Sequence, residues 1–465
     1  MIYDDTICAI STPPGVGGIA VARISGPSAI DIAGRIWQGP QLNDVAGYTA
    51  RYGTIVDPAT GEELDQGMAT VFRTPRSYTG ENVVELSVHG SRWIQRELVN
   101  LLLRQGCRLA EPGEFTRRAF ASGKLDLAEA EGVADMIASS SRAAHRIAMT
   151  QMRGEFSRKL GELHDRLLEL ASLLELELDF SEEEVEFASR RQLLSLASEI
   201  HTTVDRLAST FSTGAAIKDG IPVAIVGATN AGKSTLLNRL LRDDRAIVSD
   251  IHGTTRDVVE DTVEVDGVLL RFIDTAGLRS TDDTIETLGI GRTIDRLRKA
   301  SIVLWVIDAS APETLEPTWT AIKEQLSEAQ IVIAVVNKTD RIEPTRKQSV
   351  EAEVRRCVGH DSIVPFISAR DDESLRGLEE TIVKASGASS IKPGDIMITN
   401  QRHYQALVLS GASISRAIEG LQSDLPGDLI AQDIRETLHH LATITGRITT
   451  ADILATIFTR FCIGK

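Results

Sequence analysis

The sequence predicts a multidomain fold that combines mixed α/β and all-α parts, and three observations lead to that prediction. The chain has 465 residues, which is long for one compact domain, so two or three domains are expected. Within residues 216–385, apolar strand-like runs alternate with helical stretches and end in polar or glycine-containing turns, as in a parallel α/β domain. Apolar stripes with helical spacing occur on both sides of that segment.

Residues 1–119 form the first predicted domain. They are rich in glycine, proline and β-branched residues, and short runs such as 19–24 (I-A-V-A-R-I) and 83–86 (V-V-E-L) have the composition of strands. We therefore expect a mixed α/β domain at the N-terminus.

The next predicted domain is helical and is made from two separate segments, 120–215 and 386–465. Both segments carry apolar residues at steps of three and four, which predict amphipathic helices. The simplest architecture inserts 216–385 between two helices of this domain. The stripes comprise Phe156, Leu160, Leu163, Leu167, Leu170 and Leu174 before the insertion and Ile430, Ile434, Leu438 and Leu441 after it.

Composition narrows the class of protein. A formal net charge of −16 argues against a surface coated by nucleic acid, although one local basic patch remains compatible with it. No apolar run reaches the ~18 residues of a membrane span, and the acidic N-terminus lacks a signal-peptide pattern. We expect a cytoplasmic protein, because the cysteines are scattered without zinc or disulfide spacing; they are Cys8, Cys107, Cys357 and Cys462.

Residues 227–234 read G-A-T-N-A-G-K-S and match the phosphate-loop pattern G-x-x-x-x-G-K-S. The motif lies between the apolar run 223–226 and a predicted helix, which is its required context. The glycines let backbone N–H groups converge on phosphate oxygens, Lys233 adds a positive charge, and the Ser234 hydroxyl can ligate Mg²⁺. The inserted segment is therefore predicted to be a Ras-like P-loop domain.

Later motifs extend this prediction to a GTPase. Residues 250–257 (D-I-H-G-T-T-R-D) contain a threonine that can ligate a metal. Residues 274–277 read D-T-A-G, in which Asp274 can hold Mg²⁺ through water and the Gly277 N–H can meet the γ-phosphate. Residues 337–340 read N-K-T-D, where the Asp340 carboxylate can accept two hydrogen bonds from guanine N–H groups that adenine lacks. Residues 368–369 (S-A) offer a backbone contact to the guanine carbonyl.

One expected part is missing. Leu278 follows the D-T-A-G turn where Ras-type enzymes carry a glutamine that positions water. Hydrolysis is then either very slow or supported by other groups. Asn230 could help to hold a monovalent cation in the place of an arginine finger. Glu286 is a candidate to polarise water, but the residues alone favour a solvated glutamate at a helix start.

Several further segments carry a resemblance that covers the whole chain. They read T-P-P-G-V-G-G-I at 12–19, R-I-S-G at 23–26, P-G-E-F-T-R-R-A-F at 112–120, G-K-L-D-L at 123–127 and F-C-I-G-K at 461–465. Together with the GTPase motifs, the chain resembles the MnmE (TrmE) family of bacterial and organellar tRNA-modification GTPases. The P-G-E-F-T-x-R-A-F and C-I-G-K motifs are the most specific.

The resemblance implies an N-terminal domain similar to folate-binding domains, a homodimer, and a heterotetramer with the flavoprotein MnmG (GidA). It also implies addition of an aminomethyl or carboxymethylaminomethyl group to the wobble uridine of certain tRNAs, using 5-formyl-tetrahydrofolate or another one-carbon tetrahydrofolate. Cationic side chains suit the carboxylates of a folate, and Glu85 suits the pterin N–H groups. The folate contacts that the resemblance implies are Arg23, Glu85, Lys124 and Lys465.

For the nucleotide, the resemblance implies a K⁺ ion held by Asn230, Ser249, Ile251 and Thr254, Mg²⁺ held by Ser234 and Thr255, and Glu286 as the residue that activates water. Cys462 falls near the implied folate, where it could react or simply pack as a small apolar residue, and Arg256 is a further possible site residue. With the motifs, the predicted GTP contacts are Asn230, Ala231, Gly232, Lys233, Ser234, Thr235, Ser249, Thr254, Thr255, Asp274, Thr275, Ala276, Gly277, Asn337, Lys338, Asp340, Ser368 and Ala369.

A different class of GTPase is the main alternative. A ribosome-assembly GTPase of the Era or EngA type also has an apolar residue after D-x-x-G. It would need a basic RNA-binding tail with a G-x-x-G loop or a second phosphate loop, and the sequence shows neither. A helical scaffold with a vestigial GTPase is disfavoured because every nucleotide motif is intact.

Overall fold

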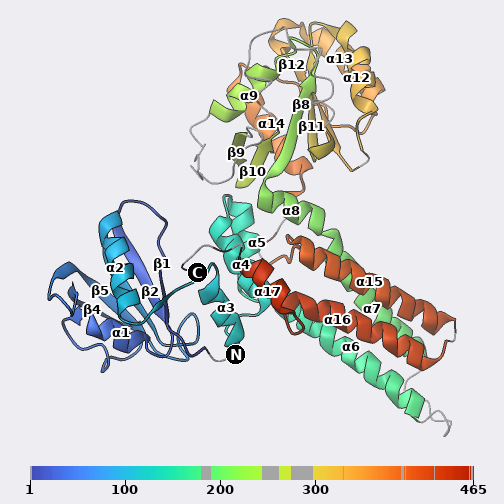
Figure 1. Ribbon diagram of the computed structural model, residues 1–465. Helices are drawn as coiled ribbons and strands as arrows, with labels where there is room; N and C mark the ends of the chain where they lie inside the picture. The colour runs from blue at the N-terminus through green and yellow to red at the C-terminus, as the bar shows by residue number, and fades with distance from the viewer. Residues whose placement is uncertain are drawn as a thin grey trace. The chain divides into compact units, whose positions relative to one another are not determined.

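The N-terminal domain is built on a seven-stranded sheet in the order β3-β4-β5-β6-β2-β1-β7 (Figure 1). All its strand pairs are antiparallel except β1 with β7. The strands predicted at 19–24 and 83–86 are confirmed as parts of β2 and β6. The strands are β1 (Ile7–Ile10), β2 (Gly17–Ser25), β3 (Trp37–Gln38), β4 (Thr49–Val56), β5 (Glu63–Phe72), β6 (Val83–Gly90) and β7 (Arg108–Leu109).

This computed structural model describes residues 3–179, 190–242, 261–273, 297–327, 329–388, 392, 394–423, 425–459, 461 and 464. Those residues divide into two compact units. The first comprises Met1–Ala134, Gln151–Ala197 and Ser413–Lys465, and the second comprises Asp135–Thr150 and Ser198–Ala412. No helix within the described ranges is long and apolar enough to cross a membrane.

The two faces of the N-terminal sheet differ. Helices α1 (Ala29–Arg35) and α2 (Arg92–Arg104) cover one face, where they share a core with Ala22 and Ile24 of β2 and Leu86 of β6. Because side chains alternate along a strand, Arg23 and Glu85 project to the opposite face. That face therefore carries polar side chains that the helices α1 and α2 leave uncovered.

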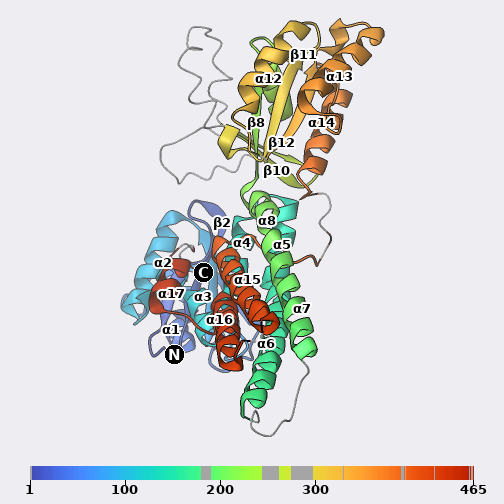
Figure 2. The ribbon, with the colours of Figure 1, turned by 90° about the vertical axis from the view of Figure 1, so that its right-hand side faces the viewer.

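The helices before and after the inserted domain pack together, as the apolar stripes predicted. All six apolar residues predicted on the first stripe are buried in α6 (Glu155–Asp179), which packs against α16 (Gly427–Thr445) of the C-terminal segment (Figures 1 and 2). Of the second stripe, Ile430, Ile434 and Leu441 of α16 are buried, and Leu438 is half-buried. The other helices are α3 (Glu114–Ala121), α4 (Leu127–Ala138), α5 (Arg142–Met152), α7 (Arg190–Ser209), α15 (Gln401–Gln422) and α17 (Ala451–Phe458).

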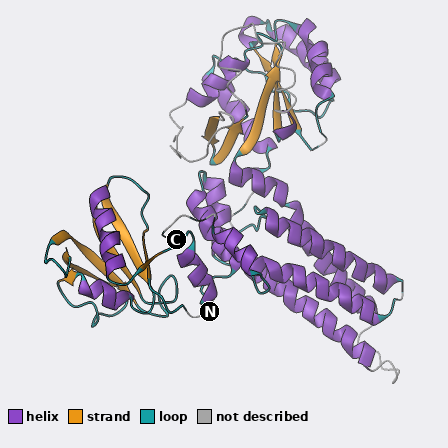
Figure 3. Cartoon of the chain, viewed as in Figure 1, coloured by secondary structure: helices purple, strands orange, loops and turns teal. Residues whose placement is uncertain are grey.

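The inserted domain has a five-stranded sheet in the order β12-β11-β8-β10-β9, parallel except for β9. Its central strands are nearly continuous apolar runs, because helices cover both faces (Figure 3). The strands are β8 (Ile221–Gly227), β9 (Asp261–Val265), β10 (Val268–Phe272), β11 (Ile302–Asp308) and β12 (Ile331–Asn337). The helices are α8 (Phe211–Asp219), α9 (Lys233–Arg242), α12 (Leu315–Lys323), α13 (Pro344–Val358) and α14 (Asp372–Ala385), with 3₁₀ turns at Pro312–Thr314 and Thr339–Arg341.

Candidate functional site

The phosphate loop joins the end of β8 to the start of α9, as its pattern requires. Gly227 and Gly232 have φ angles of +151° and +99°, which favour glycine. A Cβ atom at Gly227 would overlap the Val306 carbonyl oxygen, and one at Gly232 would overlap the Asn337 side-chain amide. Both glycines are therefore needed for conformation and for close approach.

Lys233 is held over the loop by the loop's own backbone. Its Nζ donates to the carbonyl oxygens of Gly227 at 2.9 Å and Ala228 at 2.8 Å. The residue is also the first of α9, so its charge lies beside a helix N-terminus, which favours anions. Ser234 and Thr235 follow in the first turn of that helix.

Asn337 links the phosphate loop to the loop at 368–369. Its side chain is 1% exposed. The Nδ2 group donates to the carbonyl oxygen of Ala231 at 2.9 Å, while Oδ1 accepts from the backbone N–H of Ala369 at 3.0 Å. The first residue of N-K-T-D thus holds the two loops together through both ends of its side-chain amide.

Lys338, the second residue of N-K-T-D, contacts both the phosphate loop and Asp308, a residue that was not predicted from the sequence. Its backbone is left-handed, with φ of +62°, and its Nζ donates to the Asp308 carboxylate at 2.7 Å and the Asn230 carbonyl oxygen at 2.5 Å. Burial opposes ionisation of Asp308, but the bonds from Lys338 and Ser310 outweigh it and lower its pKa. The position of Asp308 at the carboxyl end of β11 was the signal that could have identified it.

Asp340 lies in the turn after β12 with its carboxylate ionised. The Ser368 hydroxyl donates to its Oδ1 at 2.8 Å, and that hydrogen bond is the main cause of its lowered pKa. Ser374 in α14 in turn fixes Ser368, because its hydroxyl donates to the Ser368 carbonyl oxygen at 3.0 Å. The structure thus brings N-K-T-D and S-A together, as the motif order predicted.

Other predicted nucleotide and metal residues lie outside the described residues, as do two residues of the C-terminal tail. The structure therefore leaves their roles as predictions. They are Ser249, Ile251, Thr254, Thr255, Arg256, Asp274, Thr275, Ala276, Gly277, Glu286, Cys462 and Lys465.

Arg23 and Glu85, on the neighbouring strands β2 and β6 of the N-terminal sheet, form an ion pair. They are direct partners in the register of β2 and β6, and Nε and an NH2 nitrogen of Arg23 lie 2.9 and 2.8 Å from Oε1 of Glu85. The C-terminal segment reaches this pair, because the Gly464 carbonyl oxygen accepts from Ser11 Oγ at 3.1 Å and from Arg23 at 3.4 Å. Residues from the two ends of the chain therefore meet here.

Lys124 follows α3 in a turn that lies against another loop of the same domain. Its backbone N–H donates to the Ala119 carbonyl oxygen at 2.9 Å, and its Cε lies 3.6 Å from the position that a Cβ atom at Gly80 would take. Of the four predicted folate contacts, Arg23 and Glu85 touch directly, no contact joins the Lys124 side chain to them within the described residues, and Lys465 lies outside those residues.

The N-terminal domain also contains a buried network of charged side chains that was not predicted from the sequence. Arg118 is 1% exposed, and its guanidinium bonds to Asp5, Glu81 and the fully buried Glu114. Burial opposes ionisation of Glu114, but bonds from Arg108, a backbone N–H and Arg118 outweigh it and lower its pKa. The i,i+4 spacing of Glu114 and Arg118 within P-G-E-F-T-R-R was the available signal.

In the inserted domain, then, the phosphate loop and the loops at 337–340 and 368–369 meet at the carboxyl edge of one parallel sheet, where such folds bind nucleotides. That arrangement is the one found in P-loop GTP-binding proteins, and this chain is a GTP hydrolase of that class.

Comparisons with known proteins give the particular family. Residues 6–124 match a family model described as "GTP-binding protein TrmE N-terminus", and residues 127–462 match one described as "MnmE helical domain". The tRNA modification GTPase MnmE of Bacteroides fragilis is 49% identical over 467 residues, and that of Bacteroides thetaiotaomicron is 48% identical, each covering 99% of both chains. The chain belongs to the MnmE (TrmE) family, and the predicted fold class is confirmed.

Among solved structures, a GTP-binding protein of Sulfolobus solfataricus in complex with GDP is 19% identical. The match covers 49% of this chain and 67% of that chain, with a TM-score of 0.28. The family membership rests on the sequence relatives instead.

Proposed function

We propose that this GTPase acts in tRNA modification. With a flavoprotein partner of the MnmG type it would add an aminomethyl or carboxymethylaminomethyl group to the wobble uridine of certain tRNAs, in the cytoplasm. The observation that carries the proposal is the 48–49% identity, over 99% of both chains, to relatives named tRNA modification GTPase MnmE. The phosphate loop and the loops at 337–340 and 368–369, which lie together at the carboxyl edge of the sheet, also support it.

The nucleotide site supports guanine selectivity. The backbone N–H groups of residues 227–234 bind phosphate oxygens, Lys233 offsets their charge, and the ionised Asp340 accepts the guanine N–H groups. The hydroxyls of Ser234 and Thr255 are hard oxygen ligands of the kind that Mg²⁺ prefers, and a bound Mg²⁺ would neutralise charge on the phosphates.

A potassium ion would stand in the place of an arginine finger and, together with Glu286, would compensate for the missing water-positioning glutamine. Asn230 has a left-handed backbone (φ of +62°) at the tip of the phosphate loop, and Lys338 anchors its carbonyl oxygen. This fixed backbone suits a ligand at the edge of the site, and Ser249, Ile251 and Thr254 would add oxygens. Glu286 would orient the attacking water. If so, Glu286→Ala lowers kcat and leaves GTP affinity unchanged, which phosphate-release and nucleotide-titration assays would check.

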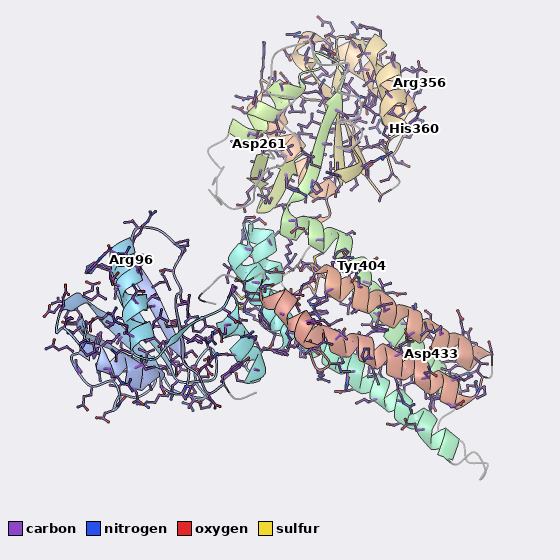
Figure 4. All side chains as sticks on the ribbon, viewed as in Figure 1. Arg96, Asp261, Arg356, His360, Tyr404 and Asp433 are labelled. Atoms are coloured by element: carbon purple, nitrogen blue, oxygen red, sulfur yellow. The ribbon has the colours of Figure 1, made fainter. Side chains whose placement is uncertain are left out.

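The N-terminal domain would bind a one-carbon tetrahydrofolate at Arg23, Glu85, Lys124 and Lys465. The chemistry fits, because a paired carboxylate and cations suit a pterin and a glutamate tail. Calorimetric titration with 5-formyl-tetrahydrofolate tests it. Arg23→Gln should weaken binding, whereas Arg96→Gln on α2 (Figure 4), a matched change at an exposed arginine, should not.

The domain would also form a homodimer. On the sheet face opposite α1 and α2, Tyr52 and Met68 are direct partners across β4 and β5. They are 62% and 38% exposed, and tyrosine and methionine are enriched at protein interfaces. Light scattering of the full chain and of Met68→Glu would test this assignment, with a shift to monomer expected for the variant.

Mass analysis of wobble uridines in tRNA from a strain that lacks this protein is the decisive test of the function. We expect the aminomethyl and carboxymethylaminomethyl uridines to disappear and to return when the gene is restored. Unchanged modification in the deletion strain would rule the proposed function out.

A further inference from the structure

Lys338 connects the loop proposed to recognise the base with the loop that holds the phosphates. It is the second residue of N-K-T-D, two positions before Asp340, and its Nζ lies 2.5 Å from the Asn230 carbonyl oxygen in the phosphate loop. Its neighbour Asn337 bonds to the carbonyl oxygen of Ala231, the next residue of that loop, at 2.9 Å. Two consecutive residues of the base motif therefore hold two consecutive carbonyl groups of the phosphate loop.

Asp308 holds the ammonium end of this lysine. It is the last residue of β11, the strand between β8, which leads into the phosphate loop, and β12, which leads into N-K-T-D (Figure 1). Its Oδ2 accepts from Lys338 Nζ at 2.7 Å, and its Oδ1 accepts from the backbone N–H and the hydroxyl of Ser310 at 2.9 and 2.6 Å. The side chains of Asp308 and Lys338 are 13% and 21% exposed, so salt screens their attraction only weakly.

An amide cannot replace this carboxylate, although the two groups have nearly the same shape. Both carboxylate oxygens of Asp308 accept hydrogen bonds, one from Lys338 and the other from Ser310. An amide has one acceptor oxygen, and its NH2 group only donates. Asp308→Asn would therefore turn an NH2 group toward a donor on one side or the other, and would weaken the contact with little change in volume.

A nucleotide bound to both loops would lie along the Lys338 side chain. The stem of this side chain runs from the base motif to the tip of the phosphate loop, and the methylene groups of such a stem offer apolar surface while the charged end stays paired. A stem held in place before the nucleotide arrives loses little side-chain freedom on binding, and preorganisation of this kind raises affinity.

We propose that Asp308 is the positioning residue for Lys338 and thereby sets how tightly the site holds guanine nucleotides. The inference rests on the proposed recognition of guanine by Asp340, and it adds a residue that acts through Lys338 rather than on the nucleotide itself. Because the stem would lie beside every nucleotide bound there, Asp308 affects GDP and GTP by the same factor.

A double-mutant cycle on the full chain tests whether Asp308 acts through Lys338. Titration with fluorescently labelled GDP, followed by competition with GTP, should show about tenfold weaker binding of both nucleotides by Asp308→Asn. Lys338→Met keeps a long side chain without the ammonium group, so the NH2 group would no longer face that donor. Adding Asp308→Asn to Lys338→Met should therefore weaken binding by less than about twofold further.

The matched control is Asp361→Asn, the same change at an exposed aspartate beyond the end of α13. It should leave the affinities for GDP and GTP unchanged. Should Asp308→Asn fail to fold, Ser310→Ala removes one bond to the same carboxylate and should weaken binding of both nucleotides by about threefold. Unchanged affinity of Ser310→Ala would in that case overturn the inference.

Two results with a folded Asp308→Asn protein overturn the inference. One is an unchanged affinity for GDP. The other is an equal loss in the parent protein and in Lys338→Met, which would show that Asp308 does not act through the lysine. If the parent protein binds ADP as tightly as GDP, the guanine site itself is wrong and the inference falls with it.

Discussion

The phosphate loop and the Arg23–Glu85 pair are both proposed to receive anionic ligands, but they are assembled from very different lengths of chain. The phosphate loop is one unbroken segment, 227–234, whose glycines and helix start provide the site almost by themselves. The Arg23–Glu85 pair depends on strand register and on a carbonyl group of Gly464, far along the sequence. A local motif can therefore be recognised from its own spacing, whereas the residues of an assembled site could be named from the sequence only through the resemblance to a family.

The two sites also hold their charges differently. Lys233 is bonded to backbone carbonyl oxygens, so its position depends on loop conformation rather than on another side chain. Arg23 is bonded to a carboxylate and lies beside two aromatic rings. We expect single substitutions to act within one site only, and the following predictions test that separation, from the largest expected effect to the smallest.

The largest expected effect is the dependence of hydrolysis on potassium. Leu278 cannot orient water, so a cation held with the help of Asn230 would have to compensate. A charge of the arginine-finger type contributes roughly 10³–10⁵ in rate, so turnover should be far faster in KCl than in NaCl at matched ionic strength. Asn230→Ala should lose this preference in a phosphate-release assay while folate affinity stays constant. Equal rates of the parent protein in the two salts would refute the prediction.

Asp340→Asn should reduce GTP affinity by about 2–5 kcal/mol, because it removes a charged acceptor for the guanine N–H groups. Titration with GTP and with xanthosine triphosphate measures the change, and the variant should gain relative affinity for the second nucleotide. Folate binding should be unaffected. Unchanged GTP affinity would show that Asp340 does not recognise the base.

Removing residues 461–465 should separate the two activities. The truncation deletes the Gly464 carbonyl group that Ser11 and Arg23 contact, as well as Lys465. Losing hydrogen bonds to charged groups costs about 1.5–3 kcal/mol each, so affinity for 5-formyl-tetrahydrofolate should fall about 100-fold or more. Hydrolysis in potassium should remain nearly intact. Full folate affinity in the truncated protein would mean that the tail is not part of the site.

The smallest expected effect concerns acid stability. Glu114 has a pKa below its ordinary value of 4.5 because bonds from Arg108 and Arg118 outweigh the effect of burial. A carboxyl group with a lowered pKa in the folded state stabilises the fold above pH 4.5, and this contribution disappears as pH falls through the folded-state pKa. Glu114→Gln should therefore lower the free energy of unfolding by about 1–3 kcal/mol at pH 7 and by much less near pH 3. A pH-independent difference in denaturant titrations would contradict this origin.

Much of the fold and of the nucleotide site could be predicted because the signals are local. The stripe from Phe156 to Leu174 follows from helical periodicity, and it is buried as expected. The phosphate loop follows from spacing between a strand and a helix. By contrast, the partners of Asp308 and Arg118 depend on which strands and helices become neighbours, and a single sequence does not show this.

The sequence by itself therefore determined the kind of each domain, the order of the nucleotide motifs and the family. Periodicity and motif spacing are properties of a few consecutive residues, and over so short a stretch covalent geometry leaves the backbone few possible conformations. Only the tertiary structure decided that Asn337 links two loops, that Lys338 pairs with Asp308, and that Gly464 lies against Arg23. These contacts join residues distant in sequence, and such contacts form only when the packing of strands and helices has fixed their register.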